Sequence, residues 1–224
     1  MRSLIEGFQF VFANKIILGT LSLDLFAVLL GGAVSLLPIF AREILHSGPH
    51  GLGILRAAMP VGAVLCALLL AHRPPLQKAG RTMLICVAFF GLATILFGLA
   101  NQACLGRLVP APDSVWLGLA FLLLAVCGAV DNVSVVVRQT LVQLLTPDEK
   151  RGRVSAVNSL FIGTSNELGG TESSFAAWMF GPMIGFSNAT GTIASTVVGG
   201  FGTLAVVVAV ALIWPEIRRY GKLS

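Results

Sequence analysis

Residues 128–145 read GAVDNVSVVVRQTLVQLL, an apolar segment that carries both an aspartate and an arginine in its interior. Asp131 and Arg138 are seven residues apart, so a helix places them on one face, about 10 Å apart along its axis. Asn132 begins a neighbouring polar stripe that Gln139 and Gln143 continue. A charge at the centre of a bilayer costs about 2.5–3.5 kcal/mol, so these faces must meet other helices or water. The segment therefore predicts a membrane helix that borders a polar interior.

The composition of the whole chain supports a membrane protein. Of its 224 residues, 56% are hydrophobic and only 11% are charged, too few charges to cover the surface of a soluble domain. Apolar runs of about 20 residues, the length that crosses a bilayer, recur along the chain. We therefore expect an all-α membrane protein with six transmembrane helices. The predicted spans cover residues 16–40, 52–71, 82–100, 115–137, 154–177 and 192–214.

The segments outside these spans are short and predict the orientation. Residues 1–15 have the pattern of an amphipathic lead-in helix, and residues 215–224 form a tail. Twelve of the fifteen Lys and Arg residues fall on the side that holds both termini, and three (Arg42, Arg56 and Arg107) fall on the other. The positive-inside rule then predicts that both termini are cytoplasmic. It also explains the net charge of +5 without a nucleic-acid partner.

Several other classes of protein and site are not supported. The four cysteines show no paired spacing, and the three histidines lie near predicted loops, so we expect no disulfide framework and no metal site. No HExxH or GxSxG element and no cluster of aspartates is present, so we expect neither an enzyme nor a cofactor. The first apolar run begins near Ile16, is long and carries Asp24. We expect a retained span rather than a removable signal peptide.

Three further carboxylates fall in apolar surroundings, and two interpretations stay open for each. Asp24 lies about a third of the way into the first span, where it either lines a pathway or locks two helices together. Glu167 and Glu172 are separated by about 140° around a helix, so at least one should meet a cavity, where it could carry a proton. Alternatively, the fifth span ends early and both glutamates face outer solvent. Asp131 and Arg138 likewise form either static locks or a charge pair coupled to protons or substrate.

The segment TPDEKRGRV, residues 146–154, predicts a loop followed by a helix. Thr146 with Glu149 has the spacing of a capping box, and Pro147 suits a first helical position, so we expect a short surface helix before the fifth span. Its Lys150, Arg151 and Arg153 either bind phospholipid headgroups, cap the C-terminus of a neighbouring helix, or are a plain topology signal.

The sequence resembles the C-terminal six-helix half of a major facilitator superfamily exporter, with most similarity to the enterobactin-exporter-like and macrolide-efflux-like branch. The resemblance rests on motifs spread over nearly the whole chain. They are FVFANKIILG (10–19), LDLFAVLLGGAVSLLPIFA (23–41), GPHGLGILRAAMPVGA (48–63), GAVDNVSVVVRQTLVQLLTPDEKRGRVSAVNSLF (128–161) and SNELGGTES (165–173). The loop HRPPLQKAGR (72–81) keeps Gly80 and Arg81 of the family's basic inter-span loop but lacks its usual acidic residue.

The resemblance implies a multi-pass protein of the bacterial inner membrane that exports small organic molecules by alternating access, usually driven by proton entry. It implies two inverted three-helix repeats in this half, with cavity-facing residues on the first, fourth and fifth spans. On the positions quoted above, the candidates for the substrate and proton pathway are Asp24, Asp131, Asn132, Arg138, Asn166, Glu167 and Glu172. The candidates for gating at the cytoplasmic loops are Gly80, Arg81, Arg151, Gly152 and Arg153.

The expected partners are membrane lipid, protons, a small-molecule substrate, and either an N-terminal six-helix half or a second copy of this chain. Because the resemblance covers only six of the family's twelve spans, two functions stay open. The chain is either half of a transporter or a truncated or regulatory membrane module that does not transport alone.

Overall fold

The computed structural model describes residues 2–72, 78–106 and 110–221, which form helices and short connections without any strand. Arg73, Arg107 and Lys222, three of the cations used to predict the orientation, lie outside these ranges. The long helices are α2 (Lys15–Leu30), α4 (Gly48–Ala71), α5 (Ala79–Leu99), α7 (Asp113–Leu145), α8 (Asp148–Phe180) and α9 (Asn188–Ile213). The shorter ones are α1 (Arg2–Ala13), η1 (Ala33–Leu36), α3 (Leu37–Ile39), η2 (Phe40–Ile44), α6 (Gln102–Leu105), η3 (Pro182–Ile184) and α10 (Pro215–Arg219).

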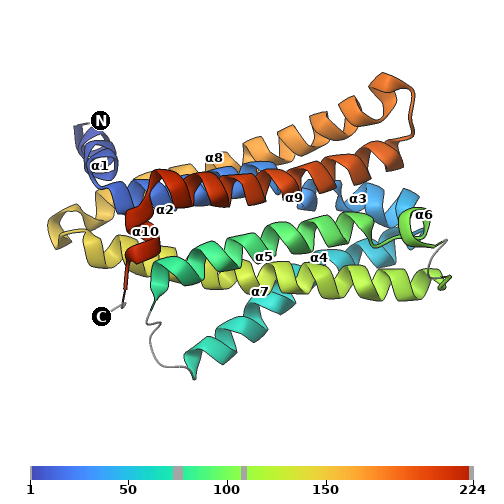
Figure 1. The fold of residues 1–224 in the computed structure, drawn as a ribbon, viewed down its shortest axis with the longest axis horizontal. Helices are drawn as coiled ribbons and strands as arrows, with labels where there is room; N and C mark the ends of the chain where they lie inside the picture. The colour runs from blue at the N-terminus through green and yellow to red at the C-terminus, as the bar shows by residue number, and fades with distance from the viewer. Residues whose placement is uncertain (1, 73–77, 107–109, 222–224) are drawn as a thin grey trace.

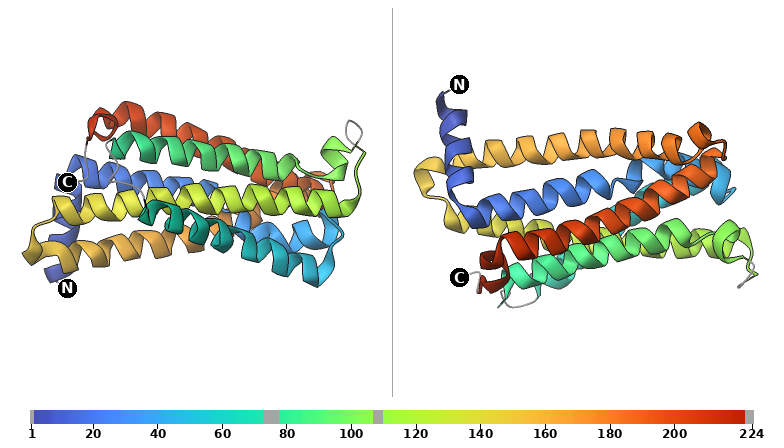
Figure 2. Two further views of the ribbon diagram at one scale, coloured as in Figure 1. Left: turned by 90° about the horizontal axis from the view of Figure 1, so that it is seen from below. Right: turned by 45° about the horizontal axis from the view of Figure 1, so that its top comes forward.

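The long helices run side by side along the long axis of the molecule (Figure 1). The two ends of the chain lie at the same end of this bundle, and α1 is turned away from the bundle axis (Figures 1 and 2). This arrangement agrees with an even number of crossings. Which end faces the cytoplasm stays a prediction.

Five helical segments are long and apolar enough to cross a membrane: Lys15–Ile44, Gly48–Ala71, Ala79–Leu99, Asp113–Leu145 and Asn188–Ile213. The α8 helix is as long as α7, with 33 residues, but it is not among them. Charged residues at its start and Glu167 and Glu172 within it interrupt its apolar sequence. The sixth span and the inverted repeats therefore stay predictions.

The helix α8 is continuous, which corrects the expectation of a separate short surface helix before the fifth span. Thr146 ends α7 as its C-cap residue, and Pro147 precedes α8 without a side-chain hydrogen bond to the helix. The predicted capping box is therefore not formed. Asp148 and Glu149 lie in the first turn of α8, where negative charge is favoured by the helix dipole.

Close backbone approach holds α4 against α7 where these helices cross. Gly62 leaves no room for a side chain, because an added Cβ would overlap the carbonyl oxygen of Ala125. Gly128 has the same relation to the carbonyl oxygen of Met59. Small residues permit such contacts between membrane helices, where van der Waals packing replaces the hydrophobic effect as the main attraction.

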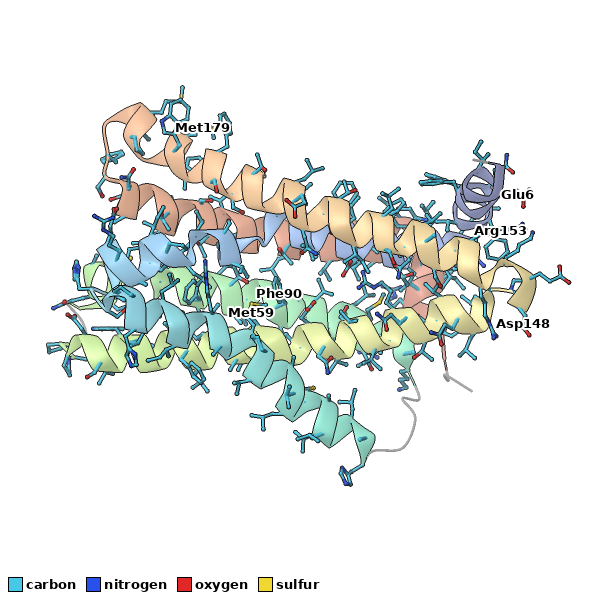
Figure 3. All side chains as sticks on the ribbon, turned by 180° about the vertical axis from the view of Figure 1, so that it is seen from behind. Glu6, Met59, Phe90, Asp148, Arg153 and Met179 are labelled. Atoms are coloured by element: carbon cyan, nitrogen blue, oxygen red, sulfur yellow. The ribbon has the colours of Figure 1, made fainter. Side chains whose placement is uncertain are left out.

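The lead-in and the tail pack on one end of the bundle. In α1, Val11 is fully buried, and Glu6 forms an ion pair with Arg153 of α8 (Figure 3). In α10, Ile217 is fully buried beside Gly80, the first-turn glycine of α5. Both terminal segments are therefore part of the fold.

Candidate functional site

A cavity of about 730 Å³ opens between five parts of the bundle. Its walls come from α2 with η1, from α4, from α5, from α7 and from α8. The lining residues are Val28, Gly31, Gly32, Val34, Ser35, Arg56, Met59, Phe90, Asp131, Asn166 and Gly170. The volume lies within the range of roughly 300–1,000 Å³ that is usual for sites of small organic ligands.

The first membrane segment is broken where it meets this cavity. The α2 helix ends at Leu30, and its continuation begins only at Ala33 as the 3₁₀ helix η1. The connecting residues, Gly31 and Gly32, both line the cavity. Irregular backbone within a membrane is tolerated where it is buried in protein or faces a water-filled space. The break therefore lies where protein and the cavity, instead of lipid, surround the backbone.

Two opposite charges line the cavity. Asp131 comes from α7 and Arg56 from α4. Within the described ranges, neither side chain has an oppositely charged group within ion-pair distance. Arg56 is three residues before Met59, and Asp131 is three residues after Gly128, which touches Met59. Each charge therefore lies about 4.5 Å along its helix from that contact, on opposite sides of it.

The remaining wall is apolar, apart from Ser35 of η1 and Asn166 of α8. Val28 and Val34 come from the broken first segment, Met59 from α4 and Phe90 from α5. Figure 3 shows Met59 and Phe90 in the central part of the bundle. Apolar walls with a few polar groups are the usual form of a site for an organic molecule.

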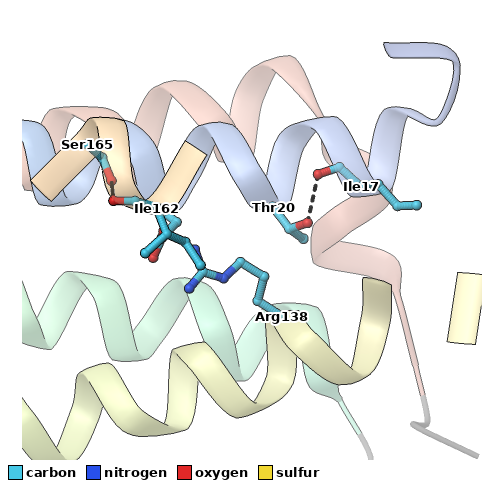
Figure 4. A network of polar contacts seen from close by, with 6 residues as sticks. Ile17, Thr20, Arg138, Ile162 and Ser165 are labelled. Carbon is cyan, nitrogen blue, oxygen red and sulfur yellow. Dashed lines mark hydrogen bonds and ion pairs between the residues drawn. The ribbon is translucent and has the colours of Figure 1, made fainter. Parts of the chain in front are cut away.

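A second charged site lies outside this cavity. Arg138 of α7 forms an ion pair with Asp24 of α2, and their side chains are only 3% and 12% exposed. Figure 4 shows the Arg138 side chain extending away from α7 toward α2. Arg138 Nε has no hydrogen-bond partner among the described residues. The pair thus connects the first and fourth membrane segments through a buried and incompletely satisfied guanidinium.

The other predicted pathway residues have three different surroundings. Asn132 Nδ2 donates a hydrogen bond of 3.3 Å to the carbonyl oxygen of Ala63, so it joins α7 to α4 beside the cavity. Glu167 is exposed and does not line the cavity. Glu172 is half-buried and accepts a hydrogen bond of 3.4 Å from Ser173 Oγ. The structure therefore brings Asp131 and Asn166 to the cavity and leaves both glutamates outside it.

The predicted gating residues lie at the end of the bundle that holds both termini. Gly80 is buried against Ile217, and Arg81 is exposed. Arg151 forms an ion pair of 2.8 Å with Asp148 one turn earlier in α8. Arg153 pairs with Glu6, and Gly152 between them is exposed. A role for these residues in gating stays a prediction.

Arg56 is the charged lining residue that the sequence analysis missed, because its position near a span end suggested only a topology signal. The available signal was its spacing from Met59 and Gly62 on a face that packs against α7. No group of three or more His, Cys, Asp or Glu residues that could hold a metal ion occurs among the residues described.

Comparison with known proteins identifies exporters as relatives. Over 220 residues, the chain is 26% identical to the enterobactin exporters EntS of Escherichia coli O1:K1, Escherichia coli O157:H7 (strain EC4115) and Shigella boydii serotype 18. Each match covers 98% of this chain and 47% of the relative, so the chain spans about half the length of these curated relatives. No family model matches the chain, and no solved structure matches it.

The similarity to these exporters and the five apolar helices support a multi-pass membrane protein that is similar to about half of a transporter. Its membership of the major facilitator superfamily and its location in the bacterial inner membrane stay predictions. The branch within that superfamily stays a prediction.

Proposed function

We propose that this chain is the C-terminal half of a secondary active exporter of small organic molecules that works by alternating access and proton antiport. The observation that carries the proposal is the cavity of about 730 Å³, which several membrane helices line and which contains the unpaired carboxylate of Asp131. The similarity to enterobactin exporters supports export as the direction of transport. The substrates would be drug-like or siderophore-like molecules.

In this proposal, Asp131 carries the coupling proton. A carboxylate that has no ion-pair partner and faces an open cavity can bind and release a proton without breaking a structural contact. Asp24 is different, because its protonation would remove the charge that Arg138 needs. Neutralising a partner of a buried ion pair leaves an uncompensated charge. We therefore assign proton carriage to Asp131 and helix positioning to the Asp24–Arg138 pair.

The experiment compares efflux by matched variants of the complete transporter. The chain would be co-expressed with the N-terminal six-helix half, and efflux of fluorescent substrates of opposite charge, anionic fluorescein and cationic ethidium, would be followed in cells. Asp131→Asn should abolish proton-driven efflux while leaving membrane insertion intact. Asp113→Asn changes an exposed carboxylate on the same helix, outside the cavity, and should leave efflux unchanged. Undiminished efflux by the Asp131 variant would remove its coupling role.

The second candidate function is a truncated or regulatory membrane module that does not transport alone. It is favoured by one observation, the 47% of the relatives' length that this chain covers. Reconstituting the 224-residue chain by itself in proteoliposomes distinguishes the two. Substrate-dependent proton flux by the chain alone, as a dimer of two copies, would reject the regulatory module. Flux that requires an added N-terminal half would support the half-transporter, whereas no flux under either condition would favour the module.

A further inference from the structure

Arg56 is the one cation among the described residues that lines the cavity. The other intramembrane arginine, Arg138, is 3% exposed and is paired with Asp24. Arg56 is exposed, and no described carboxylate lies within 4 Å of it. An arginine presents five donors in a planar fork that matches a carboxylate or another planar oxyanion. The Arg56 fork is therefore free to hold a ligand.

Asp131 limits which part of the cavity an anion can occupy. The two charges lie on opposite sides of the Met59–Gly128 contact, each about 4.5 Å from it along its own helix. An anionic group is attracted toward Arg56 and repelled from Asp131. A cationic group has the opposite preference. The charge arrangement thus gives a bound molecule one favoured orientation.

The rest of the wall selects an apolar body. Val28, Val34, Met59 and Phe90 line the space next to these charges. Val34 is 52% exposed, so its apolar surface is available to a ligand. Methionine side chains adapt to varied apolar shapes, and both methionine and phenylalanine make favourable contacts with aromatic rings. An aromatic or aliphatic body would remove this surface from water.

We propose that the cavity binds amphiphilic organic molecules with one anionic group, and that Arg56 determines this selectivity by holding the anion while the apolar body packs on Met59 and Phe90. This inference rests on the proposed function, since it names the substrate class of the same cavity. It adds a residue, a ligand charge and a ligand orientation that the proposed transport function does not require.

The test measures equilibrium binding and needs no transport. The complete 224-residue chain would be placed in lipid nanodiscs, and the probes would be 1-naphthoate, 1-naphthalenemethanol and 1-naphthylmethylammonium. They share one ring system and differ in charge. Titration calorimetry against empty nanodiscs should show saturable binding of 1-naphthoate, with weaker binding of the neutral and cationic probes.

Substitutions then assign the selectivity to Arg56. Arg56→Gln should weaken the binding of 1-naphthoate about tenfold or more, because a hydrogen bond to a charged group contributes about 1.5–3 kcal/mol. The affinity for the neutral probe should change little. Arg56→Lys should restore part of the affinity, and Arg42→Gln, outside the cavity, should have no effect. Asp131→Asn should tighten 1-naphthoate binding and weaken the cationic probe, which provides a second test if Arg56→Gln fails to fold.

Three results would overturn the inference: no saturable binding of 1-naphthoate, equal loss of all three probes in Arg56→Gln, or unchanged anion affinity in both Arg56→Gln and Asp131→Asn. The proposed transport function can be rejected independently of this inference. If anion selectivity is found but Asp131→Asn leaves efflux intact, proton coupling through Asp131 is wrong and the binding inference stands. If efflux behaves as expected but the anion is not preferred, only the substrate class is wrong.

Discussion

The molecule contains two intramembrane sites that combine an aspartate with an arginine, and the two are built in opposite ways. Asp24 and Arg138 form a buried ion pair between α2 and α7. Asp131 and Arg56 line an open cavity and do not pair with each other or with another described residue. The same residue types therefore serve two purposes. We expect the buried ion pair to fix the helices in place, and we expect the two unpaired charges at the cavity to stay available to protons and ligands.

This difference predicts the largest effect at the buried site. Replacing Arg138 with Met should lower the free energy of unfolding by about 3–5 kcal/mol, because Asp24 would remain as a buried charge without a partner. Unfolding in mixed SDS micelles, followed by circular dichroism, measures the change. The double variant Asp24→Leu/Arg138→Met should recover most of the loss, since it removes both charges. A double variant less stable than the single one would contradict the role of the pair as a charge lock.

The stability of the bundle beside the cavity should depend on close backbone packing instead of an ion pair. Gly128→Leu should destabilise the fold by about 1–3 kcal/mol, since its side chain would overlap the backbone of Met59 and push α4 away from α7. The same measurement on Gly118→Leu, on the same helix, provides the control, because a Cβ at Gly118 would meet no atom of a neighbouring element within 4 Å. Equal stability of the two leucine variants would show that the α4–α7 approach is not tight.

An exposed ion pair provides a third case for this comparison. Glu6 and Arg153 are 51% and 42% exposed, so solvent screens their attraction. Glu6→Gln should cost about 0.2–1 kcal/mol of unfolding free energy at low salt, and less at 1 M salt. Glu43→Gln, at an exposed glutamate without a described ion pair, should show no such salt dependence. A loss at Glu6 that matched the loss at Arg138 would remove the distinction between buried and exposed pairs.

The smallest effect on stability is expected at Asp131. Asp131→Asn should change the free energy of unfolding by less than about 0.5 kcal/mol, because no ion pair is broken. The identical change at Asp24 should cost several times more, and the two variants can be compared in one set of unfolding curves. If both aspartates proved equally important for stability, the proposed division between a lock and a ligand site would fail.

The helical architecture could be predicted from the sequence because each apolar run has the length of a membrane crossing. The extent of the longest helices could not be predicted in the same way. The predicted spans were residues 115–137 and 154–177, but α7 extends from Asp113 to Leu145 and α8 from Asp148 to Phe180. Hydropathy records where a helix meets lipid, whereas backbone hydrogen bonding continues until a residue such as Thr146 leaves the helical conformation.

The candidate site was predictable where a residue's own position decides its surroundings. Asp131 interrupts an apolar helix, so a polar environment was expected for it, whereas Asn166 was a candidate through the family resemblance; both line the cavity. The partner of Arg138 was not predictable, because Asp24 is 114 residues away and the pairing depends on which helices become neighbours. Arg56 was missed for a related reason. The Arg56 side chain lines a cavity that exists only once five parts of the chain have assembled.

The contact between α1 and α8 has a consequence for how the chain is made. Glu6 and Arg153 are 147 residues apart, so α1 is synthesised long before the helix on which it packs. The apolar face of α1, which includes the fully buried Val11, therefore lacks its contacts with Val154 and Val157 until α8 has been synthesised. We therefore expect α1 to be among the last helices to dock on the bundle. In nascent chains that stop before residue 153, α1 should be cleaved more readily by proteases.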